Sequence, residues 1–407
     1  MMNEKNVKDY QKYERTIRTI HKRFRTYGYK RIKTSTFEEY DLYSKVTSSI
    51  DQNEMIKIID RTGQVLVLRP DVTIPITRQL AEEYTELPNE LRYFYVQDVF
   101  RQQDDRAEAI ESTQAGVEYY CESSPEADAE VIALACHTLR DLGFTDIKIE
   151  IGHAGFFKQL VEEINLTPYQ LVQLKKSIQS KNVVDIQSFL GNLSIDEDVK
   201  NAIGMIPFLY GDPLEVSEKA RSLVQETKLH ETLDYLIEVY EILKVYGLEK
   251  YLVLDLGLIN HMDYYSDIIF QGFVGKFGKP VLMGGRYDEL GNEFGANLPA
   301  IGFACQVESL VQASDSENLS RRFPIDVIIT YDRDSLSESI TFANELRERN
   351  YYVLASPSQK KNTSRELSNY QIIINNGEMT FYHKGNGSSF STITELLTLM
   401  TESKGRV

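Results

Sequence analysis

Asp71 and Thr73 stand directly between an apolar run at residues 65–68 and a helical pattern. A free amino acid carries an ammonium group, a carboxylate and a side chain, so a site for it needs acceptors, donors and a shaped recess. A carboxylate and a hydroxyl at this place can hold the ammonium group. The alternative is structural, because Asp71 is equally placed to cap the helix that holds Ile74 and Ile76.

Gln114 and Glu118 lie four residues apart in a segment with the pattern of a strand. Residues at i and i+4 of a strand point to the same face, together with Gly116 between them. A polar pair on a face that is otherwise expected to be apolar means either that this face is solvated or that it carries a site. The spacing alone leaves both open.

The elements that must position these residues are predicted from the hydrophobic pattern. Extended runs at 91–101 and 112–120 are joined by a polar loop, which indicates a hairpin and therefore an antiparallel sheet. Residues 7–28 have the periodicity of an amphipathic helix that ends at a glycine. Residues 56–68 contain two β-rich runs around Asp-Arg-Thr-Gly, which predicts another hairpin.

Farther along the chain, residues 125–142 are predicted to be a helix, with Pro near the first turn and Gly just past the end. From about 154 to 247 the pattern is helix after helix without a convincing strand, which indicates a helical insertion. Around the insertion the patterns predict strands at residues 146–151, 251–256, 266–270 and 280–283, and a helix after Ile301.

A linker rich in Ser, Asp and Asn at residues 313–320 separates the first domain, residues 1–312, from a small α/β domain at 321–407. Within the small domain the order is strand, helix, strand, strand, strand and helix, and the glycine- and serine-rich run at 385–389 is predicted to be a loop. The predicted fold class is α+β, an antiparallel sheet with helices and a helical insertion, followed by the small domain.

Net charge, hydropathy and cysteine spacing disfavour several classes of protein. The formal net charge is −16, which is unfavourable for a protein whose main partner is a nucleic acid. No apolar run reaches the length of a transmembrane helix, and the polar N-terminus lacks the pattern of a signal peptide, so a cytoplasmic protein is expected. The three cysteines show no CxxC spacing, which argues against a disulfide framework or a structural zinc site.

Four separated segments together resemble the catalytic domain of histidyl-tRNA synthetase. They are LRPDVT at 68–73, VFRQQ leading into TQAGVE at 99–118, INHMDYY at 259–265 and IGFACQVESL at 301–310. The resemblance implies the fold of a class II aminoacyl-tRNA synthetase from about residue 10 to 310. MGGRYDEL at 283–290 matches a further signature of the family; its structural alternative is a tight turn that needs Gly284 and Gly285.

The resemblance also implies a set of histidine-binding residues. The positions of Asp71 and Thr73 hold the α-amino group in the synthetases, which usually have glutamate in place of the aspartate. Tyr264 and Tyr265 match tyrosines that close over the imidazole, although two adjacent aromatic residues in a strand are more often one core and one surface residue. The complete implied set is Asp71, Thr73, Arg101, Gln114, Glu118, Tyr264 and Tyr265.

The chain departs from the synthetase pattern where ATP would react. Arg101 matches the phosphate-binding arginine of the second motif and is retained. Asn260 and Ser309 stand where the synthetases carry arginines, and Gln103 replaces a glutamate. Each preorganised donor in such a site is worth roughly 3 kcal/mol in the transition state, so these losses argue against adenylation. Ser35 replaces a proline at the dimer interface of the family.

This pattern, LRPDVTIPITR in particular, is similar to the regulatory subunits of ATP phosphoribosyltransferase, the synthetase paralogues of histidine biosynthesis. The resemblance implies a homodimer core that assembles with a short catalytic phosphoribosyltransferase subunit, activates it and transmits feedback inhibition by L-histidine. It implies no catalysis, cofactor, metal, tRNA or membrane of its own.

Two alternatives remain at this stage. A true histidyl-tRNA synthetase with unusual residues would need a basic anticodon-reading domain, whereas residues 321–407 carry 11 Lys and Arg against 10 Asp and Glu. A scaffold with a vestigial pocket would show no dependence on Asp71, Gln114 and Glu118 for any ligand.

Overall fold

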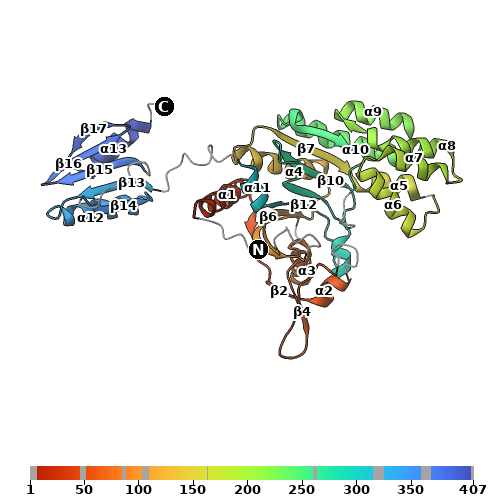
Figure 1. Cartoon of the computed structure of the whole chain (residues 1–407), viewed down its shortest axis with the longest axis horizontal. Helices are drawn as coiled ribbons and strands as arrows, with labels where there is room; N and C mark the ends of the chain where they lie inside the picture. Colours follow the sequence, from red (N-terminus) through yellow and green to blue (C-terminus); the bar gives the residue numbers. More distant parts are fainter. Residues whose placement is uncertain are drawn as a thin grey trace. The chain divides into compact units, whose positions relative to one another are not determined.

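The computed structural model describes residues 7–45, 52–84, 89–102, 110–162, 164–259, 264–314, 325–358 and 368–404. The chain divides into two compact units, Met1–Asp315 and Ser316–Val407 (Figure 1). The boundary falls inside the segment at 313–320 that was predicted to be a linker.

The first unit is built on a nine-stranded sheet. Most neighbouring strands are antiparallel, as expected from the β5–β6 hairpin, and the pairs β1/β5 and β7/β9 are parallel. The strand order is β1 (Lys30–Arg31), β5 (Leu91–Phe100), β6 (Glu111–Tyr120), β12 (Ala300–Gln306), β11 (Leu282–Arg286), β10 (Ile268–Val274), β7 (Ile147–His153), β9 (Leu252–Asp255) and β8 (Tyr210–Gly211).

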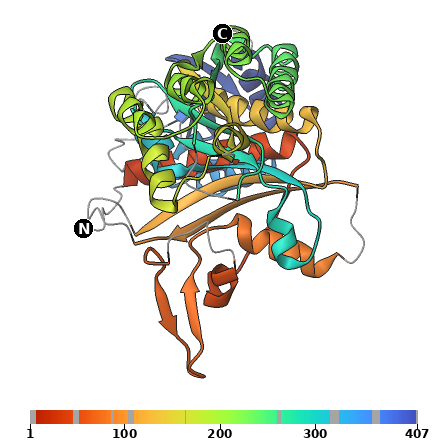
Figure 2. The ribbon, with the colours of Figure 1, turned by 90° about the vertical axis from the view of Figure 1, so that its right-hand side faces the viewer.

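Successive side chains of the long strands point to opposite faces of the sheet and pack into two separate hydrophobic cores. Phe94 of β5 and Val117 of β6 belong to the core under the helices, whereas Tyr95 and Tyr120 belong to the core on the opposite face. Figure 2 shows β5 and β6 between these two layers. The first core contains α1 (Val7–Thr26), α4 (Pro125–Asp141), α10 (Thr227–Val245) and α11 (Val307–Ala313).

The second core lies beneath smaller elements, which bring the predicted site residues over the sheet. These elements are α2 (Tyr40–Lys45), α3 (Thr73–Glu83), the short helix η3 (Leu290–Phe294) and a three-stranded sheet of β2 (Phe37–Glu39), β4 (Val65–Leu68) and β3 (Lys57–Ile59). The pairing of β3 with β4 confirms the hairpin predicted at residues 56–68.

The segment predicted as a helical insertion forms α5 (Ala154–Glu162), α6 (Pro168–Gln179), α7 (Val183–Gly191), α8 (Glu197–Met205), η1 (Ile206–Phe208), α9 (Pro213–Leu223) and α10. α6 begins at a capping box, in which the Thr167 hydroxyl accepts from the Gln170 amide while the Gln170 side chain accepts from the Thr167 amide; α10 has no side-chain cap. The expectation that it holds no strand was wrong, because β8 pairs antiparallel with β9.

The helix expected after Ile301 is α11, which begins at Val307, and residues 300–306 form the strand β12, which was not predicted. This strand is buried on both faces, and a continuous apolar run does not distinguish a buried strand from a buried helix. Tyr264 and Tyr265 precede β10 instead of lying within a strand.

The second unit has a five-stranded sheet and two helices. The strand order is β14 (Val353–Pro357), β13 (Ile325–Tyr331), β15 (Ser368–Asn375), β16 (Glu378–His383) and β17 (Asn386–Phe390), with α12 (Leu336–Glu348) and α13 (Ile393–Lys404). The loop predicted at 385–389 is mostly the strand β17. There the Tyr382 ring packs against Gly387, where a side chain would leave it no room.

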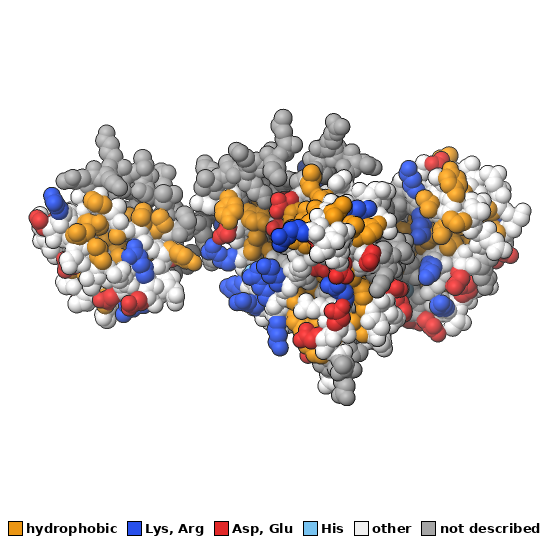
Figure 3. Space-filling model, turned by 90° about the horizontal axis from the view of Figure 1, so that it is seen from below, with side chains coloured by type: hydrophobic (Ala, Val, Ile, Leu, Met, Phe, Trp, Pro, Cys, Tyr) orange, Lys and Arg blue, Asp and Glu red, His pale blue; other side chains and the backbone are white. Residues whose placement is uncertain are grey.

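Charged side chains are unevenly distributed over the first unit. In the view of Figure 3, Lys and Arg side chains gather on one part of the face, over its N-terminal elements. Acidic side chains are scattered over the rest of the same face. The chain therefore combines a strongly negative total charge with a local concentration of positive charge.

Candidate functional site

Asp71 is buried between β4 and α3, with only 4% of its surface exposed. Its Oδ1 accepts a hydrogen bond from the Ile74 amide at 2.8 Å, so it caps α3 as the structural alternative anticipated. Burial raises the pKa of this carboxyl, and the positive charge of Arg101 acts in the opposite direction. The hydrogen bond to Oδ1 fixes the orientation of the Asp71 side chain. Its carboxyl group remains a buried hydrogen-bond acceptor beside Arg101.

Glu118 lies at the centre of a buried hydrogen-bond network. Thr73 Oγ1 donates to its Oε1 at 2.6 Å, and the Tyr287 hydroxyl donates to its Oε2. Burial raises the pKa of Glu118 to about 8, although both hydrogen bonds favour the charged form. The structure therefore joins Thr73 and Glu118, which are 45 residues apart, in one constellation.

The floor of this constellation is made of glycines from three adjacent strands. A Cβ at Gly302 would overlap the Glu118 carboxylate, and one at Gly116 would come within 2.6 Å of the Tyr95 ring. A Cβ at Gly285 would come within 2.8 Å of the Tyr265 ring. The missing side chains leave a flat surface on which the polar and aromatic groups lie. Gly285 is therefore required for close approach and not only for the turn considered from the sequence.

The aromatic wall consists of Tyr264, Tyr265 and Tyr287. The rings of Tyr264 and Tyr265 have centroids 4.8 Å apart, and Tyr264 meets Tyr287 edge-on at 5.8 Å. Neither Tyr264 nor Tyr265 is fully buried. Because Tyr287 also donates to Glu118, the wall and the carboxylate are physically connected.

Gln114 lies on the same face as Glu118, at the partly exposed end of β6. It is directly opposite Gln97 of β5 and Gln306 of β12. The sequence did not determine whether the face of β6 that carries Gln114 and Glu118 is solvated or forms a site. In the structure this face is buried at Glu118 and is partly exposed and polar at Gln114.

Arg101 follows β5 and donates from Nε to the Pro70 carbonyl at 2.8 Å. Its Nη2 is buried, and among the described residues none accepts its hydrogen bond. A buried, charged donor without an acceptor suits a carboxylate or phosphate oxygen of a ligand. Because Pro70 directly precedes Asp71, the hydrogen bond to the Pro70 carbonyl holds the Arg101 guanidinium close to Asp71.

Ser309 is buried, and its hydroxyl is already hydrogen-bonded within the chain. Its side chain is 4% exposed at the start of α11, and Oγ donates to Gln306 Oε1 at 3.1 Å. The neighbouring Glu308 accepts from the Thr113 amide at 3.0 Å, which fixes α11 against β6. Asn260 and Gln103 lie outside the described residues.

Tyr287 and Tyr95 belong to the candidate site and were missed by sequence reasoning. Tyr287 was in the signature at 283–290, but only its glycines were considered. Tyr95 was identifiable from register, because it pairs with Gly116 across the predicted hairpin and so shares the face of Glu118.

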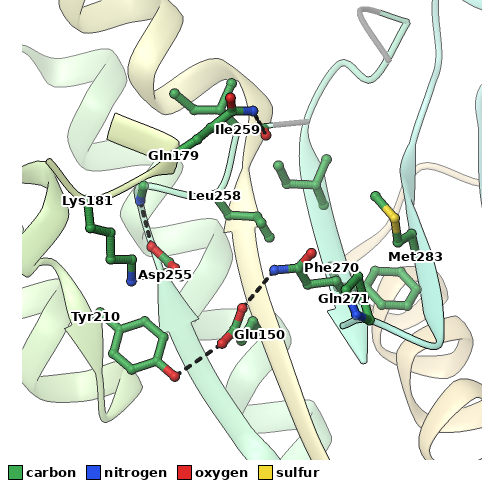
Figure 4. Close-up of a pocket in the computed structure, with 13 residues that line it drawn as sticks. Glu150, Gln179, Lys181, Tyr210, Asp255, Leu258, Ile259, Phe270, Gln271 and Met283 are labelled. Carbon is green, nitrogen blue, oxygen red and sulfur yellow. Dashed lines mark hydrogen bonds and ion pairs between the residues drawn. The ribbon is translucent and has the colours of Figure 1, made fainter. Parts of the chain in front are cut away.

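A separate cavity of about 500 Å³ opens between the insertion and β7, β9, β10 and β11 (Figure 4). Glu150 bridges its two sides by accepting from Tyr210 at 3.1 Å and from Gln271 at 2.7 Å. Lys181 pairs with Asp255 at 3.1 Å. These polar groups bond to one another across the cavity, and strand register places Glu150, Gln271 and Met283 on the same face of the sheet as Gly116 and Glu118.

Among the described residues, no cluster of His, Cys, Asp and Glu has the arrangement of a metal site. In the same part of the chain no helix has the length and apolar character needed to cross a membrane.

Comparisons with known proteins identify the family of the chain. The family model described as Histidyl-tRNA synthetase matches residues 2–310. The ATP phosphoribosyltransferase regulatory subunit of Oceanobacillus iheyensis is 41% identical over 96% of this chain and 95% of its own length. The corresponding protein of Ruminiclostridium cellulolyticum is 32% identical over 92% of both chains.

Solved structures show the same relationship. A Bacillus halodurans protein described as an ATP phosphoribosyltransferase regulatory subunit/histidyl-tRNA synthetase has a TM-score of 0.78 and 29% identity, covering 92% of this chain and 96% of its own. Histidyl-tRNA synthetase from Nostoc has a TM-score of 0.79 over 98% of this chain and 96% of its own; at 16% identity it supports the fold alone. By sequence and fold, the chain belongs to the ATP phosphoribosyltransferase regulatory subunit family, a paralogue of histidyl-tRNA synthetase.

Proposed function

We propose that this chain is a non-catalytic regulatory subunit that binds L-histidine at the Glu118 constellation. In this role it activates a separate short catalytic phosphoribosyltransferase subunit and transmits feedback inhibition to it. The observation that carries the proposal is the buried hydrogen-bond network of Thr73, Glu118 and Tyr287, together with a buried Ser309 that is bonded to Gln306 where the synthetases carry an arginine. The family names support the regulatory role.

Each end of histidine has a matching group. Asp71 and Thr73 hold the ammonium group, and Gln114 lies on the Glu118 face of β6 as a further polar contact. The unpartnered Nη2 of Arg101 supplies a charged donor for the carboxylate. Glu118 accepts from an imidazole N–H, with Tyr264 and Tyr265 as the aromatic wall.

Absence of catalysis follows from the positive charge that adenylation requires. The transition state spreads negative charge over the α-phosphate and leaving pyrophosphate, which must be met by preorganised cations. At residue 309 the chain offers a neutral hydroxyl that is already bonded to Gln306. Arg101 remains, but its single positive charge can balance one carboxylate and not the several negative charges of a triphosphate.

Feedback requires only that histidine bind one arrangement of the complex better than another. A coupling free energy of roughly 1–3 kcal/mol, which is about 5- to 150-fold in affinity, is typical for such systems. The site suits this task because both residues are bonded to α3: Asp71 caps the helix, and Thr73 of its first turn donates to Glu118. Ligand contacts at Asp71 or Glu118 can therefore shift the helix.

Calorimetric titration of the purified chain with L-histidine tests the proposal. Binding is expected for the unmodified chain and for Glu111→Ala, a matched control at the exposed end of β6. It should be lost in Glu118→Ala and in Asp71→Ala. Histidine-dependent exchange of pyrophosphate into ATP is expected to be absent.

Other outcomes select other functions. Pyrophosphate exchange above background would identify a synthetase. Retained assembly with the catalytic subunit, without histidine binding by either the chain or the complex, would identify a scaffold with a vestigial pocket.

A further inference from the structure

Arg286, the last residue of β11, is linked through its backbone to two parts of the candidate site. Tyr287 follows it directly and donates its hydroxyl to Glu118. The Arg286 carbonyl accepts from the Ser266 amide at 2.9 Å, and Ser266 directly follows Tyr265 of the aromatic wall. The position of Arg286 at the end of the strand therefore affects both the wall and the buried carboxylate.

The side chain of Arg286 is buried on the other face of the sheet. Successive residues of an extended chain point to opposite faces, so the guanidinium points away from the Tyr287 ring and reaches α4. Its Nε donates to Asp128 Oδ1 at 3.0 Å, and its Nη1 donates to the Glu122 carbonyl at 3.0 Å. Asp128 lies in the first turn of α4 and is fully buried. The guanidinium therefore joins the end of β11 to α4.

The helical insertion supplies a donor to the second carboxylate oxygen of Asp128. Tyr235 of α10, which is 107 residues away in the sequence, donates its hydroxyl to Oδ2 at 2.5 Å, whereas Arg286 Nε approaches this oxygen only at 3.4 Å. Burial raises the pKa of Asp128, while the contacts with Arg286 and Tyr235 stabilise its charge. A buried carboxylate oxygen that loses its donor is costly, and the guanidinium is the group at hand to replace the lost hydroxyl.

A purely structural role accounts for part of this arrangement. The buried pair of Arg286 and Asp128 fixes α4 against the sheet, and on this view Tyr235 only satisfies the remaining oxygen. Such a role predicts lower stability in a Tyr235 variant and no specific effect at Glu118. The pair lies one residue from Tyr287, however, so a shift of the guanidinium also moves the strand end that carries the Tyr287 hydroxyl.

We propose that Tyr235 is a positioning residue of the histidine site, through which the helical insertion sets histidine affinity; this inference rests on the function proposed above. With the Tyr235 hydroxyl in place, both oxygens of Asp128 have donors and Tyr287 reaches Glu118. Without it, the guanidinium turns toward Oδ2, the end of β11 shifts, and the hydrogen bond to Glu118 weakens. A displacement of α10 relative to α4 has the same effect, which gives the insertion a means of regulating the site.

The test is a double-mutant cycle on histidine affinity, measured by calorimetry with the full-length chain. Its members are Tyr235→Phe, Tyr287→Phe and the double variant, and each substitution removes a hydroxyl while keeping the ring. Tyr240→Phe, which makes the same change at another buried position of α10, is the matched control. Thermal melts of every variant separate a loss of folding from a loss of affinity.

Tyr235→Phe should bind L-histidine about five- to tenfold more weakly, and Tyr240→Phe within about twofold of the unmodified chain. Because Tyr235 acts through Tyr287, the double variant should bind no more weakly than Tyr287→Phe alone. Additive effects, equal weakening in Tyr240→Phe, or an unchanged affinity in Tyr235→Phe would leave only the structural role and overturn the inference while the proposed function stands. Absence of histidine binding by the unmodified chain would overturn the proposed function and the inference with it.

Discussion

If histidine binds at Glu118 as proposed, its affinity depends on pH in a direction that follows from the burial of this carboxyl. Its pKa is raised to about 8, because burial disfavours the charge more than Thr73 and Tyr287 stabilise it. Near neutral pH the empty site therefore holds a protonated carboxyl. If the carboxylate accepts an N–H of the imidazole, binding must release this proton.

The magnitude follows from the ionised fraction. With a pKa of about 8, roughly one site in eleven is ionised at about pH 7, and about three in four at about pH 8.5. Histidine affinity should therefore rise roughly eightfold over this interval, and binding at about pH 7 should release about 0.9 proton per site. The imidazole of free histidine is already largely neutral here, since its ordinary pKa is about 6.5.

The assay is calorimetry at both pH values in two buffers of different ionisation enthalpy, which counts the protons released. Glu118→Gln is the control, because it shares every titration of the ligand and lacks the carboxyl. It should bind more weakly and lose the eightfold change. Affinity that falls as pH rises, without proton release, would mean that protonated Glu118 donates to the ligand, and the reasoning would be refuted.

Three further results are expected. The free energy of unfolding should fall as pH rises from about 4.5 to about 8 and less so in Glu118→Gln, because the folded chain holds a proton that the unfolded chain releases. Gly302→Ala should destabilise the chain and abolish histidine binding, since its Cβ overlaps Glu118, whereas Gly191→Ala, in open space, should be tolerated in thermal melts. Arg286→Met should cost about 3–5 kcal/mol in chemical denaturation because buried Asp128 loses its partner, and adding Asp128→Leu should recover part of it; full stability of the single variant would contradict this.

Local sequence determined most of the secondary structure. The helix at 125–141 followed from Pro125 and Gly143, and Ser124 indeed caps it by accepting from the Ala127 amide. The β5–β6 hairpin followed from two extended runs joined by a polar loop, and its register places Gln114 and Glu118 on one face. These features depend on neighbours a few residues away, which a pattern records.

Buried and edge strands were the weak points. β12 was not predicted as a strand, because a strand that is buried on both faces lacks the alternation of apolar and polar residues. β17 was predicted as a loop because its glycine and serines have low intrinsic strand preference, which pairing with β16 overrides.

For the site, the sequence determined which residue types were available, and the family resemblance identified the seven histidine-binding candidates. Only the tertiary structure showed that Thr73 reaches Glu118, that Tyr287 completes the network and that glycines of three strands leave room for it. It also showed that Asp71 serves as a helix cap and that Arg101 keeps a donor unused. The reason is physical: capping and strand periodicity act over one or two turns of chain, whereas desolvation and hydrogen bonding at Glu118 depend on segments that only folding brings together.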